Sequence, residues 1–331
     1  MKKLKMLCAV LAITVLFSSW SVYPVQARAE TVPDYETVAQ GIIDWKKSDL
    51  GSASDGYLIN DELLKLAGTT PGDWYPIGLG RLGIKDNQSG YLAVIADNVS
   101  KRYQTPNKLD AAKATEWQRI SLAILACGGN PRKAGNDGTI DLIADGTYNR
   151  AANGKGILGR QGINGFIWGL IALDSLNYEV PEGSFYTRDD IILAILKNQL
   201  EDGGFALSGT RSDPDMTAMA MQSLTPYYNS EKIYSYTDQN GQEVHKKVRQ
   251  VVNECIRWLS EEQQADGDYF SWGTANVEST VQVAVALAGL GIDVQTDERF
   301  IKIGSDEQPN TLFDGILKYR TASGGFTHSY V

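Results

Sequence analysis

One apolar pattern recurs five times along the chain at intervals of about fifty residues, and this internal repeat constrains the fold more than any other feature. When Leu79, Ile124, Leu173, Leu224 and Leu287 are taken as equivalent, the successive steps are 45, 49, 51 and 63 residues. Each copy has the apolar spacing of a helix. The segments read DWYPIGLGRLGIKD, EWQRISLAILACGGNP, NGFIWGLIALDSLNY, DMTAMAMQSLTPYY and ESTVQVAVALAGLGID. The sequence therefore predicts an array of similar helical units.

The last step is longer because it contains an insert, KIYSYTDQNGQEVHKKV, at 232–248. Side-chain character alternates on both sides of Asn240-Gly241, a dipeptide that strongly favours a tight turn. We expect a small β-hairpin here. Asp238, Asn240 and Glu243 are residue types that can bind calcium, but they lack the full spacing of a calcium-binding loop. The turn interpretation is therefore preferred.

Further amphipathic stretches lie between the repeated segments, with their charge on one face. By contrast, FIWGLIALDSL is apolar nearly all round, and such a helix must be surrounded by protein. The chain thus alternates half-exposed outer helices with buried inner ones. We expect an all-α fold of about five helical hairpins in two concentric layers. The outer helices are expected at Glu36 to Lys47, Gly90 to Tyr103, Asp189 to Asn198, Val248 to Glu262 and Thr311 to Tyr319.

An acidic pair opens one of these outer helices, RDDIILAILKNQ. Asp189-Asp190 resembles the start of an acidic metal-binding motif, but no third acid follows at the required spacing. Acidic residues in a first helical turn are favoured by the helix dipole. The pair is therefore interpreted as a helix start.

Residues 1–29 have the form of a secretory signal peptide. A basic start precedes an apolar run from Met6 to Phe17, and small residues follow at Ala27 and Ala29. The run is shorter than the roughly 20 residues that a membrane-spanning helix needs. Cys8 lies too early in it to be a lipid-anchoring cysteine. We expect cleavage after Ala29 and an exported protein, secreted or at the cell surface, without a transmembrane segment.

The mature chain is expected to be strongly acidic. The formal net charge is −9, and cleavage also removes four basic residues, Lys2, Lys3, Lys5 and Arg28, which leaves −13. Such a surface repels nucleic acid and anionic lipid, so nucleic-acid binding is excluded. The two remaining cysteines, Cys127 and Cys255, do not make a disulfide framework. Two separate buried thiols are preferred, and pairing stays open.

Three segments give the chain a resemblance to a known family. ILKNQLEDGGF (195–205), WLSEEQQADGDYFSW (258–272) and LKYRTASGGF (317–326) each run from an outer helix into a glycine-rich turn and an aromatic residue. They are similar to the Gln-Trp motif of the prenyltransferase and squalene-oxidase repeat. Squalene and terpene cyclases, protein prenyltransferase β subunits and cobalamin-carrier α domains share this repeat. The resemblance covers roughly residues 35–331 and implies that residues 30–331 form one α/α toroid.

The resemblance also implies a ring that is not complete. The family ring has six hairpins, whereas five inner helices are found here and the sequence stops at SGGFTHSYV. A sequence truncated before a sixth inner helix, or an open ring, would explain the difference. Gly203-Gly204 and Gly324-Gly325 are expected to allow left-handed backbone after an outer helix. Phe205 and Phe326 would then pack between neighbouring units.

The stretch DPDMTA at 213–218 has two interpretations. Asp213-Pro214 suits the N-cap and first turn of an inner helix. Asn164 and Glu278 stand in two other copies where Asp215 stands in this one. Because three copies carry a capping-type group at one place, a recurring helix start is the favoured interpretation.

The same stretch resembles the acid motif of protonating, class II terpene cyclases. In that family the middle aspartate delivers a proton to an alkene or epoxide, and Asp215 would take its position, with Asp213 beside it. Such a carboxyl must be kept protonated. Met216 stands where the family has a third acid, and the export signal separates the protein from isoprenoid substrates. We therefore assign no catalytic residue.

Other chemistries lack their residues. A prenyltransferase zinc site needs three or four ligands from Asp, Cys and His, and the mature chain has only His245 and His328, neither beside a cysteine at ligand spacing. No Gly-x-Ser-x-Gly element supports a serine hydrolase. No cofactor or metal is expected, although the resemblance to cobalamin carriers makes a corrinoid a possible ligand.

The inner helices of a closed ring would surround a funnel whose mouth is formed by the loops before them. We expect an exported, non-catalytic protein that binds a small apolar or corrinoid-type molecule, or a protein partner or lid domain, at this mouth. A cyclase-like enzyme using Asp215 and a cell-surface scaffold module are the alternatives. The candidate lining residues are Trp74, Trp117, Asn164, Phe166, Trp168, Asp215, Trp272 and Glu278.

Overall fold

The computed structural model describes residues 34–329, so the predicted signal peptide at 1–29 and Cys8 lie outside the described residues. This part of the chain contains twelve α-helices and four small two-stranded sheets, so most of its regular secondary structure is α-helical. No helix within it is both long and apolar enough to cross a membrane.

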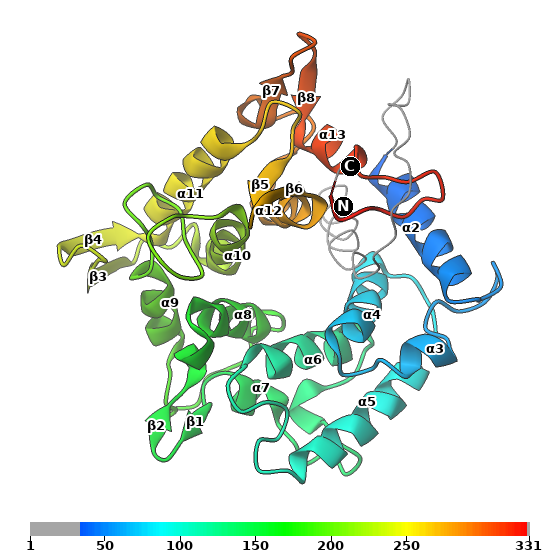
Figure 1. Cartoon of the computed structure of the whole chain (residues 1–331). Coiled ribbons are helices and arrows are strands. Elements are labelled where there is room, and N and C mark those ends of the chain that lie inside the picture. Colours follow the sequence, from blue (N-terminus) through cyan, green and yellow to red (C-terminus); the bar gives the residue numbers. More distant parts are fainter. Residues whose placement is uncertain (1–33, 330–331) are drawn as a thin grey trace.

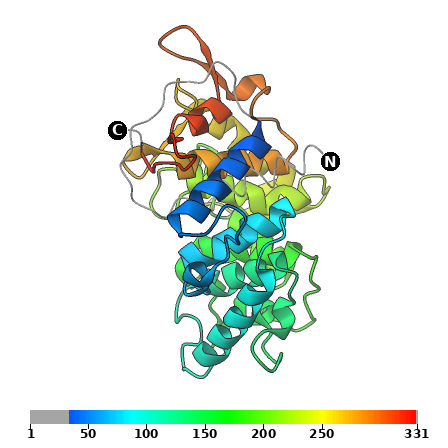
Figure 2. The ribbon, with the colours of Figure 1, turned by 90° about the vertical axis from the view of Figure 1, so that its right-hand side faces the viewer.

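Figure 1 shows one set of helices around the middle of the molecule and the other helices outside that set. Figure 2, turned by 90° from Figure 1, shows that the molecule is shallower along the viewing direction of Figure 1 than it is wide or tall in that figure. The inner helices are α4 (Thr70–Leu82), α6 (Thr115–Ala126), α8 (Ile163–Asp174), α10 (Pro214–Leu224) and α12 (Val277–Gly289). The outer helices are α2 (Tyr35–Asp49), α3 (Asp61–Leu64), α5 (Gln88–Tyr103), α7 (Leu142–Gly146), α9 (Arg188–Leu196), α11 (Val248–Glu262) and α13 (Leu312–Leu317).

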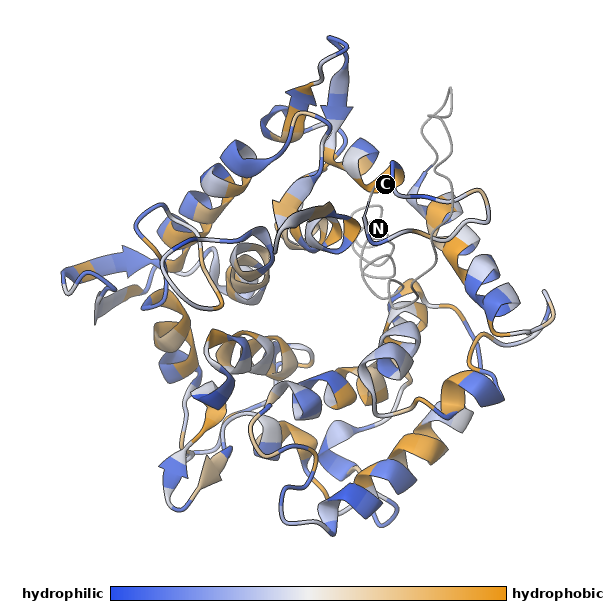
Figure 3. Ribbon diagram, viewed as in Figure 1, coloured by the Kyte–Doolittle hydropathy of each residue, from blue (hydrophilic) through white to orange (hydrophobic). Residues whose placement is uncertain are grey.

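The repeated segments of the sequence coincide with the inner helices, and the amphipathic stretches coincide with outer ones. Figure 3 shows that outer helices such as α2, α5 and α11 carry both hydrophilic and hydrophobic residues. The apolar α8 packs against α6, α9 and α10, which meets the requirement that such a helix be covered by protein. The short helices α3 and α7 were not predicted, because four or five residues are too few to show a helical period.

Left-handed glycines follow the outer helices α9 and α13, as the sequence predicted. Gly203 and Gly324 have φ values of 97° and 91°, in the left-handed region. Phe205 and Phe326 are both buried after these turns. The hydroxyl of Thr217 in α10 accepts a hydrogen bond from the Phe205 amide at 2.9 Å, which fixes the turn on the inner helix.

A buried glutamine holds each of two glycine turns against the next outer element. Gln199 Nε2 donates to the Gly203 carbonyl at 3.0 Å, and Gln263 Nε2 donates to the Gly267 carbonyl at 3.0 Å. The Gln263 amide also donates to the carbonyl of Phe300 at 3.1 Å, which lies 37 residues further along the chain. The glutamine of the recurring motif therefore ties one structural unit to the next.

The predicted hairpin at 232–248 is confirmed as β3 (Ile233–Thr237) paired with β4 (Glu243–Lys247). Asp238 Oδ1 accepts hydrogen bonds from the amides of Asn240 and Gln242 at 2.9 and 2.8 Å, so this carboxylate shapes the turn. Three further antiparallel pairs were not predicted: β1 (Ala151–Ala152) with β2 (Lys155–Gly156), β5 (Tyr269–Ser271) with β6 (Thr274–Asn276), and β7 (Ile301–Ile303) with β8 (Pro309–Thr311).

The acidic pair at the start of α9 does what helix-start residues do. Thr187 and Asp190 form a capping box, in which each side chain bonds to the backbone amide of the other residue. Asp189 accepts a hydrogen bond from Tyr234 at 2.9 Å and pairs with Lys232 at 2.6 Å. The acidic pair therefore starts a helix and anchors the inserted hairpin.

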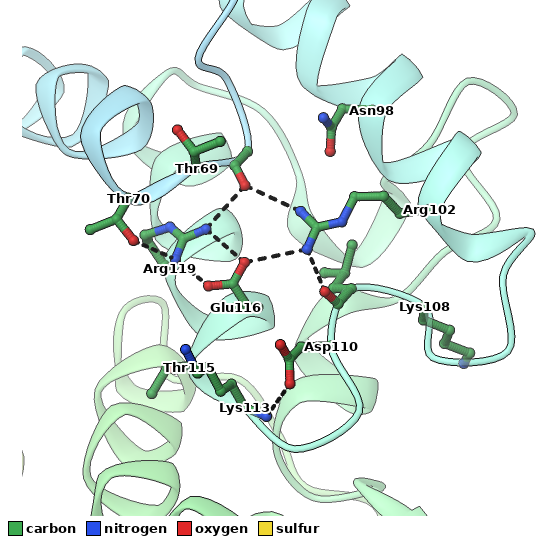
Figure 4. A network of polar contacts seen from close by, with 12 residues as sticks. Thr69, Thr70, Asn98, Arg102, Lys108, Asp110, Lys113, Thr115, Glu116 and Arg119 are labelled. Atoms are coloured by element: carbon green, nitrogen blue, oxygen red, sulfur yellow. Dashed lines mark hydrogen bonds and ion pairs between the residues drawn. The ribbon is translucent and has the colours of Figure 1, made fainter.

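A buried polar network joins α4 to α6. Asp73 has no exposed surface and accepts hydrogen bonds from the Gly68 amide at 2.6 Å, Tyr91 Oη at 2.7 Å and Arg119 Nε at 2.8 Å. Figure 4 shows Glu116 between the guanidinium groups of Arg119 and Arg102. Each charge therefore has several partners where water is scarce.

The two cysteines of residues 34–329, Cys127 and Cys255, are free thiols, and both are buried. Burial raises the pKa of Cys127 to about 12 and raises that of Cys255 as well. Cys127 is the C-cap of α6, and Cys255 lies within α11. The two separate buried thiols that the sequence favoured are therefore present.

Candidate functional site

A cavity of about 860 Å³ lies among the inner helices. Six of the eight candidate residues line it, namely Trp74, Asn164, Trp168, Asp215, Trp272 and Glu278. Apolar residues from all five inner helices complete much of its wall, among them Ile77, Leu122, Ile171, Met219 and Val285. The repeat in the sequence therefore identified most of the candidate residues that line this cavity.

The starts of neighbouring inner helices lie next to one another around this cavity, and so do their ends. Four side-chain hydrogen bonds join equivalent turns of neighbouring helices or of the segments that follow them: Arg119 to Thr70, Gln118 to the Gly165 carbonyl, Tyr227 to Asp174, and Ser279 to Asp215. Asn164, Asp215 and Glu278 are each the second residue of their helix. The alignment of these three residues is therefore confirmed, and they stand at the same end of the cavity.

The two aspartates of the Asp-Pro-Asp stretch have different roles. Asp213 is the N-cap of α10, and its carboxylate accepts a hydrogen bond from the Met216 amide at 2.9 Å. Asp215 does not cap the helix. Its Oδ2 accepts hydrogen bonds from Ser271 Oγ and Ser279 Oγ, both at 3.1 Å. The helix-start interpretation is thus confirmed for Asp213, whereas Asp215 faces the cavity.

Burial shifts the acidity of both aspartates. Loss of water raises the pKa of Asp215, and the two serine hydroxyls oppose part of that shift. The pKa of Asp213 is also raised, first by burial and then by the negative charge of Asp215, while its capping bond opposes this. The carboxyl of Asp215 is therefore easier to protonate than an exposed one.

His328 contacts Glu278, the polar residue of α12 that lines the cavity. His328 Nδ1 lies 2.8 Å from Glu278 Oε2, and the His328 carbonyl accepts a hydrogen bond from the Val277 amide at 3.3 Å. Burial raises the pKa of Glu278, and the charge of Asp215 raises it further, while His328 lowers it. Sequence reasoning did not place His328 here, because 50 residues separate the two side chains. Glu278 does not cap α12 either, because Asn276 does so.

Three tryptophans contribute aromatic surface to the cavity. The rings of Trp74 and Trp168 meet edge to face, with centroids 5.6 Å apart. Trp272 is 71% exposed and sits with Gly273 in the two-residue loop between β5 and β6. Both loop residues have positive φ, 50° and 95°, as in the tight turns that join twisted strands. The hairpin therefore holds an indole ring at the rim of the cavity.

Two predicted residues do not line the cavity. Trp117 is 2% exposed and belongs to the core, where its Nε1 donates to Tyr103 Oη at 2.7 Å and the Arg150 guanidinium lies 3.9 Å from its ring centroid. Phe166 packs edge to face on Tyr186, with centroids 5.9 Å apart. Both are corrections to the expected site, and both arise because a ring near a helix start also packs well between layers.

Several lining residues were missed. Gln222 and Gln282 face each other, and Nε2 of Gln282 donates to Oε1 of Gln222 at 3.0 Å. Gln282 follows Glu278 by four residues, so the helical period would have identified it. Asp174 also lines the cavity, and it accepts hydrogen bonds from Arg188 at 2.9 Å and Tyr227 at 2.9 Å. Its pKa is raised by burial, which these two partners oppose.

No protein-family model matches the chain, and no curated protein matches it. Residues 34–329 also contain no group of three or more His, Cys, Asp or Glu side chains suited to hold a metal ion. What the cavity binds is therefore inferred from the residues that line it.

The different roles of the two aspartates lead to opposite effects on stability. The folded state raises the pKa of Asp215 above its ordinary 3.8. The contribution of the Asp215 carboxyl to the free energy of unfolding is therefore fully present below pH 3.8. It is lost as the pH rises through the folded pKa. Asp215→Asn is therefore expected to stabilise the protein at about pH 7 relative to wild type, with no gain at about pH 3.

Asp213→Ala is expected to lose about 1 kcal/mol at neutral pH, because α10 loses its N-cap. Asp213→Asn is the matched control, since asparagine keeps the acceptor. Urea unfolding at both pH values measures these differences. A loss of stability in Asp215→Asn at neutral pH would contradict the assignment of roles.

Proposed function

We propose that this chain is an exported α/α toroid of the prenyltransferase and squalene-oxidase repeat type, and that it binds a ligand in its central cavity without transforming it. The observation that carries the proposal is the cavity of about 860 Å³ among the inner helices. This size is typical of small-molecule sites, and so is a wall of aromatic and apolar residues with a few polar groups. The basic start and apolar run at residues 1–29 support export.

The resemblance to cobalamin carriers makes a corrinoid one ligand to test, and a protein partner or lid domain seated at the rim is a further possibility. The exposed Trp272 at the rim supports contact with such a partner or lid domain. In contrast, the acidic residues Asp215 and Glu278 favour neither nucleic acid nor another anionic polymer.

One observation favours a second function, which is acid catalysis of a cyclase-like reaction. Asp215 lines the cavity, and burial raises its pKa, as a carboxyl that donates a proton requires. However, Ser271 and Ser279 both donate hydrogen bonds to Asp215, which favours its ionised form. Binding without catalysis is therefore the preferred function.

Thermal unfolding in the presence of corrinoids, isoprenoids and glycans tests both functions, because a ligand that binds only the folded state raises the Tm. We expect one class to raise the Tm of wild type, and we expect no product from wild type or from Asp215→Asn. Product formed by wild type and not by Asp215→Asn would instead establish an enzyme.

A cavity-filling variant locates the binding site. The double variant Met219→Trp, Gln222→Trp places two larger side chains on the cavity wall and is expected to abolish the Tm shift. Val94→Trp, on the outer helix α5, is the matched control and is expected to keep it. If no compound shifts the Tm of wild type, the scaffold alternative gains support.

A further inference from the structure

The ionisable residues that line the cavity are unevenly distributed. They are Arg81, Asp174, Asp215 and Glu278. Asp174 is paired with Arg188 at 2.9 Å. Arg81 lies in the last turn of α4, whereas Asp215 and Glu278 lie in the first turns of α10 and α12. One end of the cavity therefore presents two carboxyls whose described partners are two hydroxyls and a histidine.

Helix starts alone do not account for these two carboxyls. The helix dipole favours acidic residues in a first turn, but the capping amides of α10 and α12 already have acceptors in Asp213 and Asn276. Asp215 and Glu278 are instead held by side chains of other segments, Ser271, Ser279 and His328. The fold thus uses three contacts from elsewhere in the chain to orient carboxyls that no helix start requires.

A neighbouring acceptor has no partner. The Oδ1 atom of Asn164 is buried, its residue lines the cavity, and no donor reaches this atom within the described part of the chain. A buried polar atom without a hydrogen bond is costly, so a ligand that donates one would be favoured there. Asn164, Asp215 and Glu278 thus place hydrogen-bond acceptors on three consecutive inner helices.

Apolar and aromatic surface adjoins this polar end. Trp168 follows Asn164 by four residues on α8, and Met219 follows Asp215 by four residues on α10, so each lies one turn further along the same helix face. Trp272 adjoins Ser271, whose hydroxyl bonds to Asp215, so the indole is placed at the acidic end. Aromatic rings beside carboxylates are the surroundings that stabilise an organic cation.

Building on the proposed function, we propose that the ligand is a protonated organic amine with an apolar body. Its ammonium group would donate hydrogen bonds to Asp215 and Glu278. These carboxylates repel anions, and they form weaker hydrogen bonds with neutral donors than with an ammonium group. The apolar part would lie against Trp168 and Met219. Trp272 would face the cation at the rim.

Calorimetric titration with four probes that share one alkyl chain tests this inference. Octylamine carries a charge and N–H donors, octyltrimethylammonium carries only the charge, octanol is neutral, and octanoate is an anion. We expect octylamine to bind wild type about tenfold more tightly than octanol, as an ion-pair and cation-ring contribution near 1.4 kcal/mol implies. Octyltrimethylammonium should fall between the two, and octanoate should bind most weakly.

Variants separate a local effect from general attraction to an acidic protein. Asp215→Asn, Glu278→Gln should lower the affinity for octylamine to about that for octanol. Trp272→Ala should weaken octylamine severalfold. Glu62→Gln, Asp97→Asn removes two acidic groups from exposed positions outside the cavity and should keep the preference.

Equal affinity for octylamine and octanol, or a preference that survives Asp215→Asn, Glu278→Gln, would overturn the inference. Either result would leave the proposed function standing, provided that the cavity-filling double variant abolishes octanol binding. If none of the probes binds and no other compound class raises the Tm, both proposals are wrong.

Discussion

Replacing Arg119 with methionine is expected to lower the free energy of unfolding by about 3 to 5 kcal/mol, because it leaves a buried carboxylate without its countercharge. Arg119 is a hub of the network between α4 and α6. It donates to Asp73, to Glu116 and to the carbonyl of Gly68. Methionine keeps much of the apolar stem, so the loss reports mainly on charge and hydrogen bonding.

A second substitution in the same network checks this cause. Asp73→Leu in the Arg119→Met background is expected to recover part of the loss, since the uncompensated carboxylate is then gone as well. The free energies come from urea unfolding of the single and double variants.

The matched control is Lys101→Met, which breaks an exposed pair with Asp97 whose side chains are 72% and 49% accessible. That variant should unfold at nearly the wild-type urea concentration, because exposed pairs contribute little. An Arg119→Met variant as stable as Lys101→Met would show that the buried network does not stabilise the fold.

Gly165→Ala is expected to lower the free energy of unfolding by about 1 to 3 kcal/mol through overpacking. A Cβ at this position of α8 would lie 1.9 Å from the Leu158 carbonyl oxygen, so backbone must move. The Gly165 carbonyl also accepts a hydrogen bond from Gln118 of α6, so the disturbance reaches the next inner helix.

Gly289→Ala is the comparison for this prediction, because it is also a helical glycine replaced by alanine. A Cβ there would meet nothing closer than 3.7 Å, and alanine favours the helix. Thermal unfolding should show Gly289→Ala at or above the wild-type Tm and Gly165→Ala well below it. Equal Tm values would mean that α8 shifts at no cost.

Features that depend on nearby residues were predictable from the sequence. The cap at Asp213, the left-handed glycines and the hairpin around Asn240-Gly241 follow from local backbone preferences, and all are present. The repeat also aligned Asn164, Asp215 and Glu278 correctly, because equivalent positions in equivalent helices face the same way.

Features that depend on distant partners were not predictable. His328 reaches Glu278 across 50 residues and Arg119 reaches Asp73 across 46, and no local pattern announces either contact. Trp117 was misplaced for the same reason, since its hydrogen bond to Tyr103 draws the ring into the core. The composition and the repeat of the sequence identify which helices line the cavity. The direction of a side chain also depends on the residues from other segments that pack against it.

The inserted hairpin β3–β4 is held entirely from the outer side of the molecule. Its described contacts include those with Asp189 at the start of α9, with the Lys197 carbonyl after that helix, and with Glu254 of α11. None of its residues lines the cavity. Removing this hairpin would therefore leave every side chain of the cavity wall in the sequence.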